Sequence, residues 1–284
     1  MGLFKVAGID VGGDDLLFIL GPCVIENEEV MLSTAQRLAE IREKSGAKIV
    51  FKSSFDKANR SSPDSYRGPG VEEGLKILED IGERFEFPLL TDIHLPHQAK
   101  PAAEVVDILQ IPAFLCRQTD MVEAAAKTGC AVNIKKGQYM SPWNVEGILD
   151  KARSCGNKRL FATERGTFFG YNNWVVDMRS LAIMRTFDCA VVYDATHSIQ
   201  LPGGRGDSSG GEREFILPLA RAAVAAGVDG IFMEVHPEPE CAKCDGPNML
   251  PLQYVEEAIN QLQELHAVSG KYRFDPLFGV NKNG

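Results

Sequence analysis

The sequence of 284 residues lacks several features that mark large classes of protein. It has no apolar run near the roughly 20 residues that cross a membrane, and no N-terminal signal-peptide pattern. Its seven cysteines are too few and too scattered for a disulfide scaffold, and their odd number suits a reducing compartment. It also lacks an excess of basic residues: the formal net charge of −9 disfavours binding to nucleic acid or to an anionic membrane. We therefore expect a cytoplasmic protein with neither kind of partner.

What the sequence has is a regular alternation of two patterns. Eight short apolar runs, often β-branched, each end in polar residues or in glycine and proline, which is typical of buried parallel strands. They span residues 16–23, 48–54, 88–94, 106–112, 131–137, 159–166, 190–197 and 230–237. Stretches with helical spacing lie between them, at 28–43, 71–85, 121–128, from 141 onward, 212–226 and 254–266.

This alternation predicts an α/β fold, the (β/α)₈ TIM barrel. A doubly wound sheet is the alternative, but it would need a glycine fingerprint after its first strand, where this chain has GPCVIE. Phe4–Val6 and Ile9–Val11 surround a glycine and predict a short β-hairpin within residues 1–14 that closes the bottom of the barrel. No break in composition marks a second domain, so we expect residues 1–284 to form one. Two long Gly- and Ser-rich loops, 61–70 and 201–211, are candidate lids.

Six cationic residues lie at or after the ends of four of the predicted strands. Barrel enzymes place their catalytic groups at the carboxyl ends of the strands, where these residues would meet. They are Lys52, Lys57, Arg60, Arg117, Lys135 and Arg165. Single lysines in such places are often solvated surface charges, but six at one rim would repel each other unless anions bind. Arginine and lysine suit phosphate and carboxylate groups, so the pattern predicts a small anionic substrate.

A second group of side chains has the chemistry of metal ligands. Thiolate, imidazole and carboxylate together suit a divalent first-row metal, and closing a barrel places strand one beside strand eight. The group is Cys23, His197, Glu234 and Asp245. From spacing alone, a buried free cysteine with a nearby histidine is the slightly favoured interpretation, because four scattered residues are not a motif. Cys241 and Cys244 form a CxxC with no second pair and no thioredoxin-like pattern, so we interpret them as incidental.

Seven segments carry a resemblance to a known family. They are FKSSFDKANRSS (51–62), LTDIH (90–94), QIPAFLCRQTD (110–120), NIKKGQ (133–138), TERGTFFGYNN (163–173), YDATHSIQLPGG (193–204) and MEVHPEP (233–239). Over residues 16–255 the chain resembles the 3-deoxy-D-manno-octulosonate 8-phosphate synthases. The KANRSS motif (57–62) is the most specific, because the related 3-deoxy-D-arabino-heptulosonate 7-phosphate synthases carry a KPRT/S-type motif there.

The resemblance implies an activity and substrate-binding residues. That family joins phosphoenolpyruvate to D-arabinose 5-phosphate with water, releases phosphate, and supplies lipopolysaccharide (KDO) synthesis. By resemblance, Lys135 and Arg165 hold the phosphate of phosphoenolpyruvate. Its carboxylate and reacting end face Lys52, Ser54, Lys57 and Gln110. Arabinose 5-phosphate is bound by Asn59, Arg60 and Ser61, with Asp92 near its hydroxyls. Arg117 resembles an arginine that reaches this phosphate from a neighbouring subunit of a homotetramer.

The resemblance also bears on the metal and on catalysis. Metal-dependent members have cysteine in the GPC segment, which places Cys23 with His197, Glu234 and Asp245 around Zn, Fe, Mn or a similar divalent ion. The segment CDGP (244–247) instead resembles metal-independent members. The implied catalytic residues are Lys57, Asn59, Cys23 and Asp245. A lysine among other cations should have a lowered pKa, which makes Lys57 a candidate proton donor.

Three other functions are the alternatives to this one. The nearest is a heptulosonate synthase acting on erythrose 4-phosphate, which the KANRSS motif disfavours. The others are a non-catalytic phosphosugar-binding barrel and an unrelated metal hydrolase. The number of anion-binding cations disfavours the hydrolase.

Overall fold

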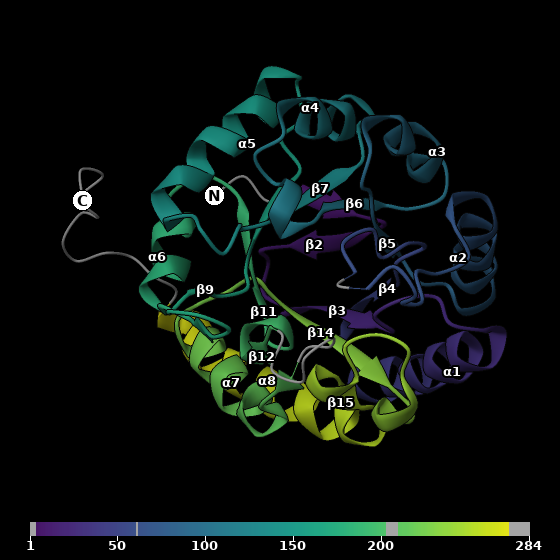
Figure 1. Cartoon of the computed structure of the whole chain (residues 1–284). Helices are drawn as coiled ribbons and strands as arrows, with labels where there is room; N and C mark the ends of the chain where they lie inside the picture. Colours follow the sequence, from purple (N-terminus) through teal and green to yellow (C-terminus); the bar gives the residue numbers. More distant parts are fainter. Residues whose placement is uncertain (1–3, 61, 203–209, 273–284) are drawn as a thin grey trace.

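The protein is seen in a computed structural model that describes residues 4–60, 62–202 and 210–272. Within these residues, eight parallel strands form a closed barrel (Figure 1). In order around the ring they are β3 (Leu17–Gly21), β4 (Lys48–Lys52), β5 (Leu89–Asp92), β6 (Ile108–Ile111), β7 (Ala131–Lys135), β8 (Leu160–Glu164), β11 (Ala190–Asp194) and β14 (Gly230–His236). Strand β14 pairs with both β11 and β3, which closes the ring. Each strand lies within a predicted run, and the predicted (β/α)₈ barrel is confirmed.

Helices surround the barrel and connect its strands (Figure 1). They are α1 (Glu28–Ser45), α2 (Val71–Phe85), α3 (Ala99–Ala103), α4 (Thr119–Lys127), α5 (Val145–Ser154), α6 (Arg179–Arg185), α7 (Ile216–Ala225) and α8 (Val255–Ser269). The sequence predicts six of these stretches but not α3 and α6. These two have five and seven residues, which is too short to show a helical period. The predicted helix start at residue 141 is a 3₁₀ turn, Pro142–Asn144, that leads into α5.

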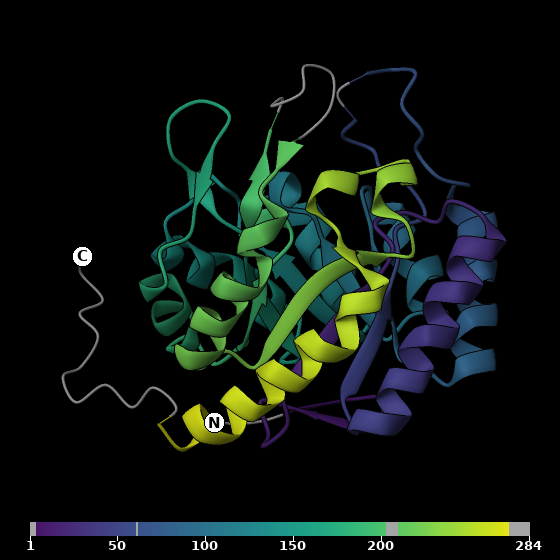
Figure 2. The same cartoon turned by 90° about the horizontal axis from the view of Figure 1, so that it is seen from below.

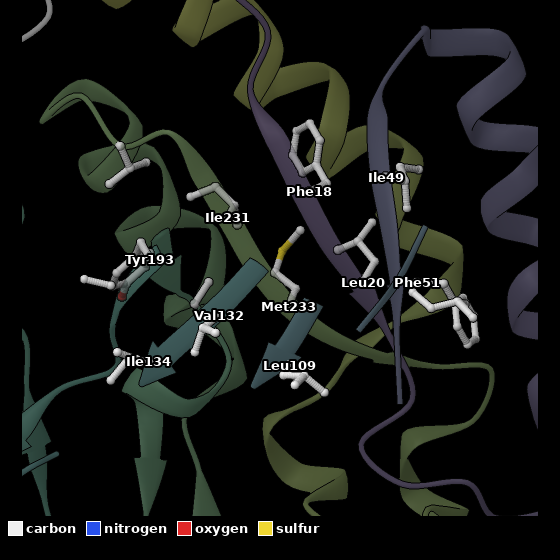
Figure 3. Packing of buried hydrophobic residues seen from close by; sticks show 14 of the residues in the cluster. Phe18, Leu20, Ile49, Phe51, Leu109, Val132, Ile134, Tyr193, Ile231 and Met233 are labelled. Carbon is white, nitrogen blue, oxygen red and sulfur yellow. The ribbon is translucent and has the colours of Figure 1, made fainter. Parts of the chain in front are cut away.

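The core has two layers, because successive side chains of a strand point to opposite faces. In β3, Phe18 and Leu20 pack outward against the helices, whereas Leu17 and Ile19 fill the barrel. Figure 3 shows members of the outer layer on neighbouring strands, among them Phe18 on β3 and Met233 on β14. Fully burying one such side chain contributes about 1.5–3 kcal/mol of transfer free energy, so these layers are the main source of stability.

The predicted hairpin is present as β1 (Phe4–Val6) and β2 (Ile9–Val11), which pair antiparallel. Val6 and Val11 are buried and belong to the same apolar cluster as the residues inside the barrel. The ring of Phe4 lies edge-on to that of Phe161, with 5.1 Å between their centroids. Figure 2 shows the hairpin at the end of the barrel opposite the long loops. The amino-terminal end of the barrel is therefore filled with side chains.

Short strands extend the opposite, carboxyl end. β9 (Thr167–Phe168) pairs with β10 (Trp174–Val175), and β12 (Gln200–Leu201) pairs with β13 (Gly210–Gly211). β15 (Leu250–Pro251) adds to β14. Parts of the two predicted lid loops, residue 61 and residues 203–209, lie outside the described residues. No helix of the described chain is both long and apolar enough to cross a membrane.

Candidate active site

A cavity of about 570 Å³ opens at the carboxyl ends of the barrel strands. Eleven of the predicted site residues line it: Lys52, Lys57, Asn59, Arg60, Asp92, Gln110, Lys135, Arg165, His197, Glu234 and Asp245. They come from widely separated parts of the chain and meet because all strands of the barrel run in the same direction.

Three other predicted residues, Cys23, Ser54 and Arg117, are not part of the cavity lining. Cys23 is fully buried behind the wall, as is Ser54, whose hydroxyl donates a hydrogen bond to Asp92. Arg117 is exposed on the surface after β6. Ser61 lies outside the described residues.

A buried ion pair lies at the floor of the cavity. Lys52 Nζ donates a hydrogen bond to Glu234 Oε1 at 2.6 Å, and each side chain is 1% exposed. Burial by itself raises the pKa of Glu234, but attraction to Lys52 and His197 outweighs it and holds the pKa well below its usual range. Glu234 is therefore an ionised carboxylate at neutral pH.

The register of the strands explains why Lys52 and Glu234 meet. Glu234 pairs with Gly21 across the junction of β14 and β3. A Cβ at Gly21 would collide with the carbonyl oxygen of Lys52, so glycine is required there for β3 and β4 to approach closely. This close approach also lets Lys52 Nζ donate to the carbonyl oxygen of Cys23 at 2.9 Å.

Lys57 corrects one sequence-based expectation. Its Nζ lies 3.7 Å from Glu234 Oε1 and 4.0 Å from Asp92 Oδ2. Burial alone lowers the pKa of Lys57, but the negative groups around it, chiefly Cys23 and Glu234, raise it well above the usual value. The expectation of a lowered pKa is wrong, because this lysine faces anionic groups more closely than it faces the other cations.

Asp92 is fixed by neutral hydrogen bonds. Gln110 Nε2 donates to its Oδ1 at 2.5 Å, and Asn133 Nδ2 donates to Gln110 Oε1 at 2.8 Å. Thr163 Oγ1 completes the chain by donating to Asn133 Oδ1 at 2.6 Å. The sequence analysis missed Asn133 and Thr163, because polar residues inside a strand carry no signal that they support a site residue from below.

Lys135 and Arg165 lie on the other side of the cavity. Lys135 contacts Asp194, another residue that the site prediction did not include. Burial lowers the pKa of both Lys135 and Arg165. Arg165 Nη2 donates to Gln200 Oε1 at 3.2 Å, whereas its buried Nη1 has no hydrogen-bond partner among the residues that the structure describes. A buried guanidinium nitrogen without an acceptor is suited to an anionic ligand.

The four predicted metal ligands belong to two groups of possible ligands that share Asp245. One group is Cys23, Cys244 and Asp245, the other is His197, Glu234 and Asp245, and within each group the donor atoms lie within 4.8 Å of one another. Cys23 Sγ lies 3.6 Å from Asp245 Oδ2. His197 Nε2 lies 3.6 Å from Glu234 Oε2 and 4.0 Å from Asp245 Oδ2. Ligand atoms bound about 2.0–2.3 Å from one tetrahedral ion are separated by similar distances. The donor set therefore fits a divalent metal.

The surroundings orient these ligands. His197 Nδ1 lies 2.7 Å from Asp194 Oδ2, which leaves Nε2 directed to the carboxylates, as is usual for a metal-ligating histidine. Asp245 has a φ of 49°, a left-handed backbone rarely adopted by residues other than glycine, and its Oδ1 accepts a hydrogen bond from Gln200 Nε2 at 3.2 Å. Asp194 lies three residues before His197, and this spacing at a strand end is the signal that could have identified it.

The sequence analysis interpreted Cys244 as an incidental cysteine, but the structure places it beside Cys23. Its Sγ is 2.9 Å from Cys23 Sγ and accepts a hydrogen bond from Arg60 Nη1 at 2.8 Å. Cys241, by contrast, is exposed. The two cysteines of the CxxC therefore have different environments, and Cys244 belongs to the wall of the cavity.

Comparisons with known proteins agree with this site. Residues 4–269 match the sequence model of the DAHP synthetase I family. The chain is 55% identical to the 2-dehydro-3-deoxyphosphooctonate aldolase of Trichlorobacter lovleyi over 265 residues, 93% of this chain and 97% of that protein. It is 54% identical to the protein of the same name from Syntrophotalea carbinolica, over 93% of this chain and 96% of that protein. The protein of that name from Xanthomonas oryzae pv. oryzae is 53% identical, over 95% of this chain and 98% of its own length.

The family model spans the barrel and the cavity, and each of these relatives covers 93–95% of the chain. The chain therefore belongs to the DAHP synthetase I family and, within it, to the 2-dehydro-3-deoxyphosphooctonate aldolases.

Proposed function

We propose that this enzyme condenses phosphoenolpyruvate with D-arabinose 5-phosphate and water, giving 3-deoxy-D-manno-octulosonate 8-phosphate and phosphate. The observation that carries the proposal is the set of cations that line one cavity: Lys52, Lys57, Arg60, Lys135 and Arg165. Both substrates carry a phosphate and phosphoenolpyruvate adds a carboxylate, so a cationic cavity matches them. The names of the curated relatives support the same reaction.

Lys135 and Arg165 are proposed to hold the phosphate of phosphoenolpyruvate. Both side chains are about 5% exposed, and the Nη1 of Arg165 lacks an acceptor within the described chain. A phosphate oxygen would accept from this nitrogen and would favour the charged forms of both groups, which burial disfavours. Lys52, Lys57, Gln110 and, through Asp92, Ser54 would then face the carboxylate and the reacting carbon atoms.

Arabinose 5-phosphate is proposed to bind nearer the mouth of the cavity. Asn59 is exposed and Arg60 half-buried, so both are available to a phosphosugar that enters last. Asp92 would accept hydrogen bonds from sugar hydroxyls, because its pKa is lowered by Lys52 and Lys57 in spite of burial. Ser61 is proposed as a further phosphate ligand on the basis of the KANRSS motif alone. The exposed Arg117 is proposed to reach the site of a neighbouring protomer, in a homotetramer of single-domain chains spanning residues 1–284.

The reaction forms one carbon–carbon bond and one carbon–oxygen bond, the latter to water, and breaks the carbon–oxygen bond to phosphate. C3 of phosphoenolpyruvate attacks the aldehyde carbon of the sugar, water adds to C2, and the tetrahedral product expels phosphate. Lys57 carries a proton at neutral pH because of its raised pKa. It would donate that proton to the aldehyde oxygen as this becomes a hydroxyl. One proton of the added water would replace it, and the other would leave with the phosphate. Asn59 would orient the sugar, and the fixed cations stabilise the moving negative charge.

We propose that Cys23, His197, Glu234 and Asp245 hold a divalent ion such as Zn²⁺, Fe²⁺ or Mn²⁺. Such an ion would act as a Lewis acid toward an oxygen of the aldehyde or of water. Asp194 would hold His197 in the orientation that directs Nε2 to the ion. Lys52 would keep the charge of Glu234 balanced whether or not the ion is bound.

The test is phosphate release from phosphoenolpyruvate, measured with arabinose 5-phosphate and with erythrose 4-phosphate. Release only with the five-carbon sugar supports the proposal, and release only with erythrose 4-phosphate would support a heptulosonate synthase instead. The same assay after chelation tests whether the reaction depends on a metal ion. Activity that is lost on chelation and restored by a divalent ion supports the metal role. Activity that survives demonstrated metal removal would support the proposed reaction and refute the role of the metal. We also propose that the enzyme acts in the cytoplasm, where it catalyses one step of lipopolysaccharide synthesis.

A further inference from the structure

The sulfur atoms of Cys23 and Cys244 lie closer together than two unbonded sulfur atoms usually do. The Sγ–Sγ distance is 2.9 Å, and both residues are free thiols. A disulfide bond is about 2.05 Å long, so less than about 1 Å of movement separates the two states. We propose that Cys23 and Cys244 form a reversible disulfide when the protein meets a peroxide, and that this modification competes with the metal for Cys23.

The local packing favours this pair. Cys23 and Cys244 belong to one small apolar cluster with Val24 and Met249. Both cysteine side chains are buried, since Cys23 is 0% and Cys244 2% exposed. A disulfide carries no charge and no polar hydrogen, and it is therefore compatible with this environment. Cys23 follows β3, and Cys244 precedes the 3₁₀ turn Gly246–Asn248.

A small oxidant can reach one of the two sulfurs. Cys244 is part of the cavity wall, whereas Cys23 lies behind it. The hydrogen bond from Arg60 Nη1 holds the Cys244 side chain at this position. The exposed Cys241 is more accessible to solvent, but no contact joins it to another sulfur in the described chain.

The peroxide is the oxidant that takes up the two electrons released when the disulfide forms. Cys244 first attacks one peroxide oxygen, which breaks the O–O bond, gives a sulfenic acid and releases one water. The sulfur of Cys23 then attacks the sulfenic sulfur, the S–S bond forms, and the hydroxyl leaves with the thiol proton as a second water. In total, two thiols lose two protons and two electrons, and the peroxide gains them. Because Cys23 is also a proposed metal ligand, its sulfur cannot serve both bonds at once.

Tryptic peptides distinguish this disulfide from its rivals. The sequence places Cys23 alone in residues 6–37, Cys241 alone in 222–243 and Cys244 alone in 244–271. Full-length protein, chelated or reloaded with Zn²⁺, is treated with hydrogen peroxide, alkylated and digested without reduction. The expected product in the chelated sample is peptide 6–37 linked to peptide 244–271, and it disappears on treatment with dithiothreitol. Linkage of 222–243 to 244–271, or overoxidised Cys244 with no linkage, would overturn the proposal.

Variants and the metal provide the controls. Cys23→Ser and Cys244→Ser should each abolish the linked species, whereas Cys155→Ser, at the end of α5, should leave it unchanged. Bound Zn²⁺ should slow its formation at least tenfold, and an unchanged rate would overturn the competition with metal. The competition rests on the proposed role of Cys23 as a ligand, but the disulfide does not rest on the proposed reaction. Phosphate release by the reduced protein tests the reaction separately.

Discussion

Replacing Lys52 by methionine should destabilise the protein strongly, because it leaves the carboxylate of Glu234 buried without its closest partner. The two side chains are each 1% exposed, and the Nζ–Oε1 distance is 2.6 Å. Removing one partner of a buried ion pair costs about 3–5 kcal/mol. Lys57 and His197 lie 3.7 and 3.6 Å from the same carboxylate and compensate in part. We therefore expect a loss of about 3 kcal/mol in the free energy of unfolding, measured by urea titration at neutral pH.

A pair with the same geometry but a different environment is the matched control. Lys127 Nζ lies 2.7 Å from Glu123 Oε2 on the outer face of α4, where the side chains are 61% and 36% exposed. Lys127→Met should cost no more than about 0.5 kcal/mol, because water already solvates both charges. Similar losses in Lys52→Met and Lys127→Met would refute the reasoning from burial.

The double variant tests the coupling itself. Lys52→Met and Glu234→Gln should each be destabilising, since each leaves a buried polar group without its charged partner. The double variant should lose about 2 kcal/mol less free energy of unfolding than the sum of the losses in the two single variants, because neither charge remains. Additive losses would mean that the two side chains do not interact in the folded protein.

Three further predictions follow from the site. Cys23→Ala should lose bound metal by elemental analysis, with activity that added metal does not restore, whereas the buried Cys189→Ala should keep both. Arg165→Ala should raise the KM for phosphoenolpyruvate about 10- to 100-fold, since a charged hydrogen bond contributes about 1.5–3 kcal/mol, and an unchanged KM would remove it from the phosphate site. Asp194 has a pKa below its usual range because attraction to His197 and Lys135 outweighs burial, so its stabilisation is present above about pH 4 and lost as the pH falls further. Unfolding titrations from pH 7 to 3 should therefore show a weaker pH dependence for Asp194→Asn than for the unaltered protein.

The sequence predicted the parts of this molecule that depend on pattern. All eight barrel strands and the hairpin follow from short apolar runs, because a buried parallel strand has to be apolar on both faces. The short helices α3 and α6 were missed because fewer than two turns show no period. Within the site, residue type and strand position identified eleven of the residues that line the cavity, since every strand of a barrel ends at the same rim.

What the sequence could not predict are contacts between residues that the pattern treats alike. Counting cations around Lys57 gave the wrong direction for its pKa, because the count ignored that two carboxylates are its near neighbours. Cys244 was interpreted as incidental because its partner Cys23 is 221 residues away. The position of Asp194 three residues before His197 was a usable signal, but its contact with Lys135, 59 residues away in the chain, was not.

The closure of the barrel between β14 and β3 has a consequence for how the protein matures. Cys23 and Asp245 are 222 residues apart, and they meet only when the last strand has paired with the first. Contacts between such distant parts of a chain form late, because the entropy of closing the loop is lost before the contact is gained. A ribosome-bound chain that has not yet released β14 therefore has no complete set of donors to offer. Binding of an ion at the proposed site would then report that the ring has closed in the correct register.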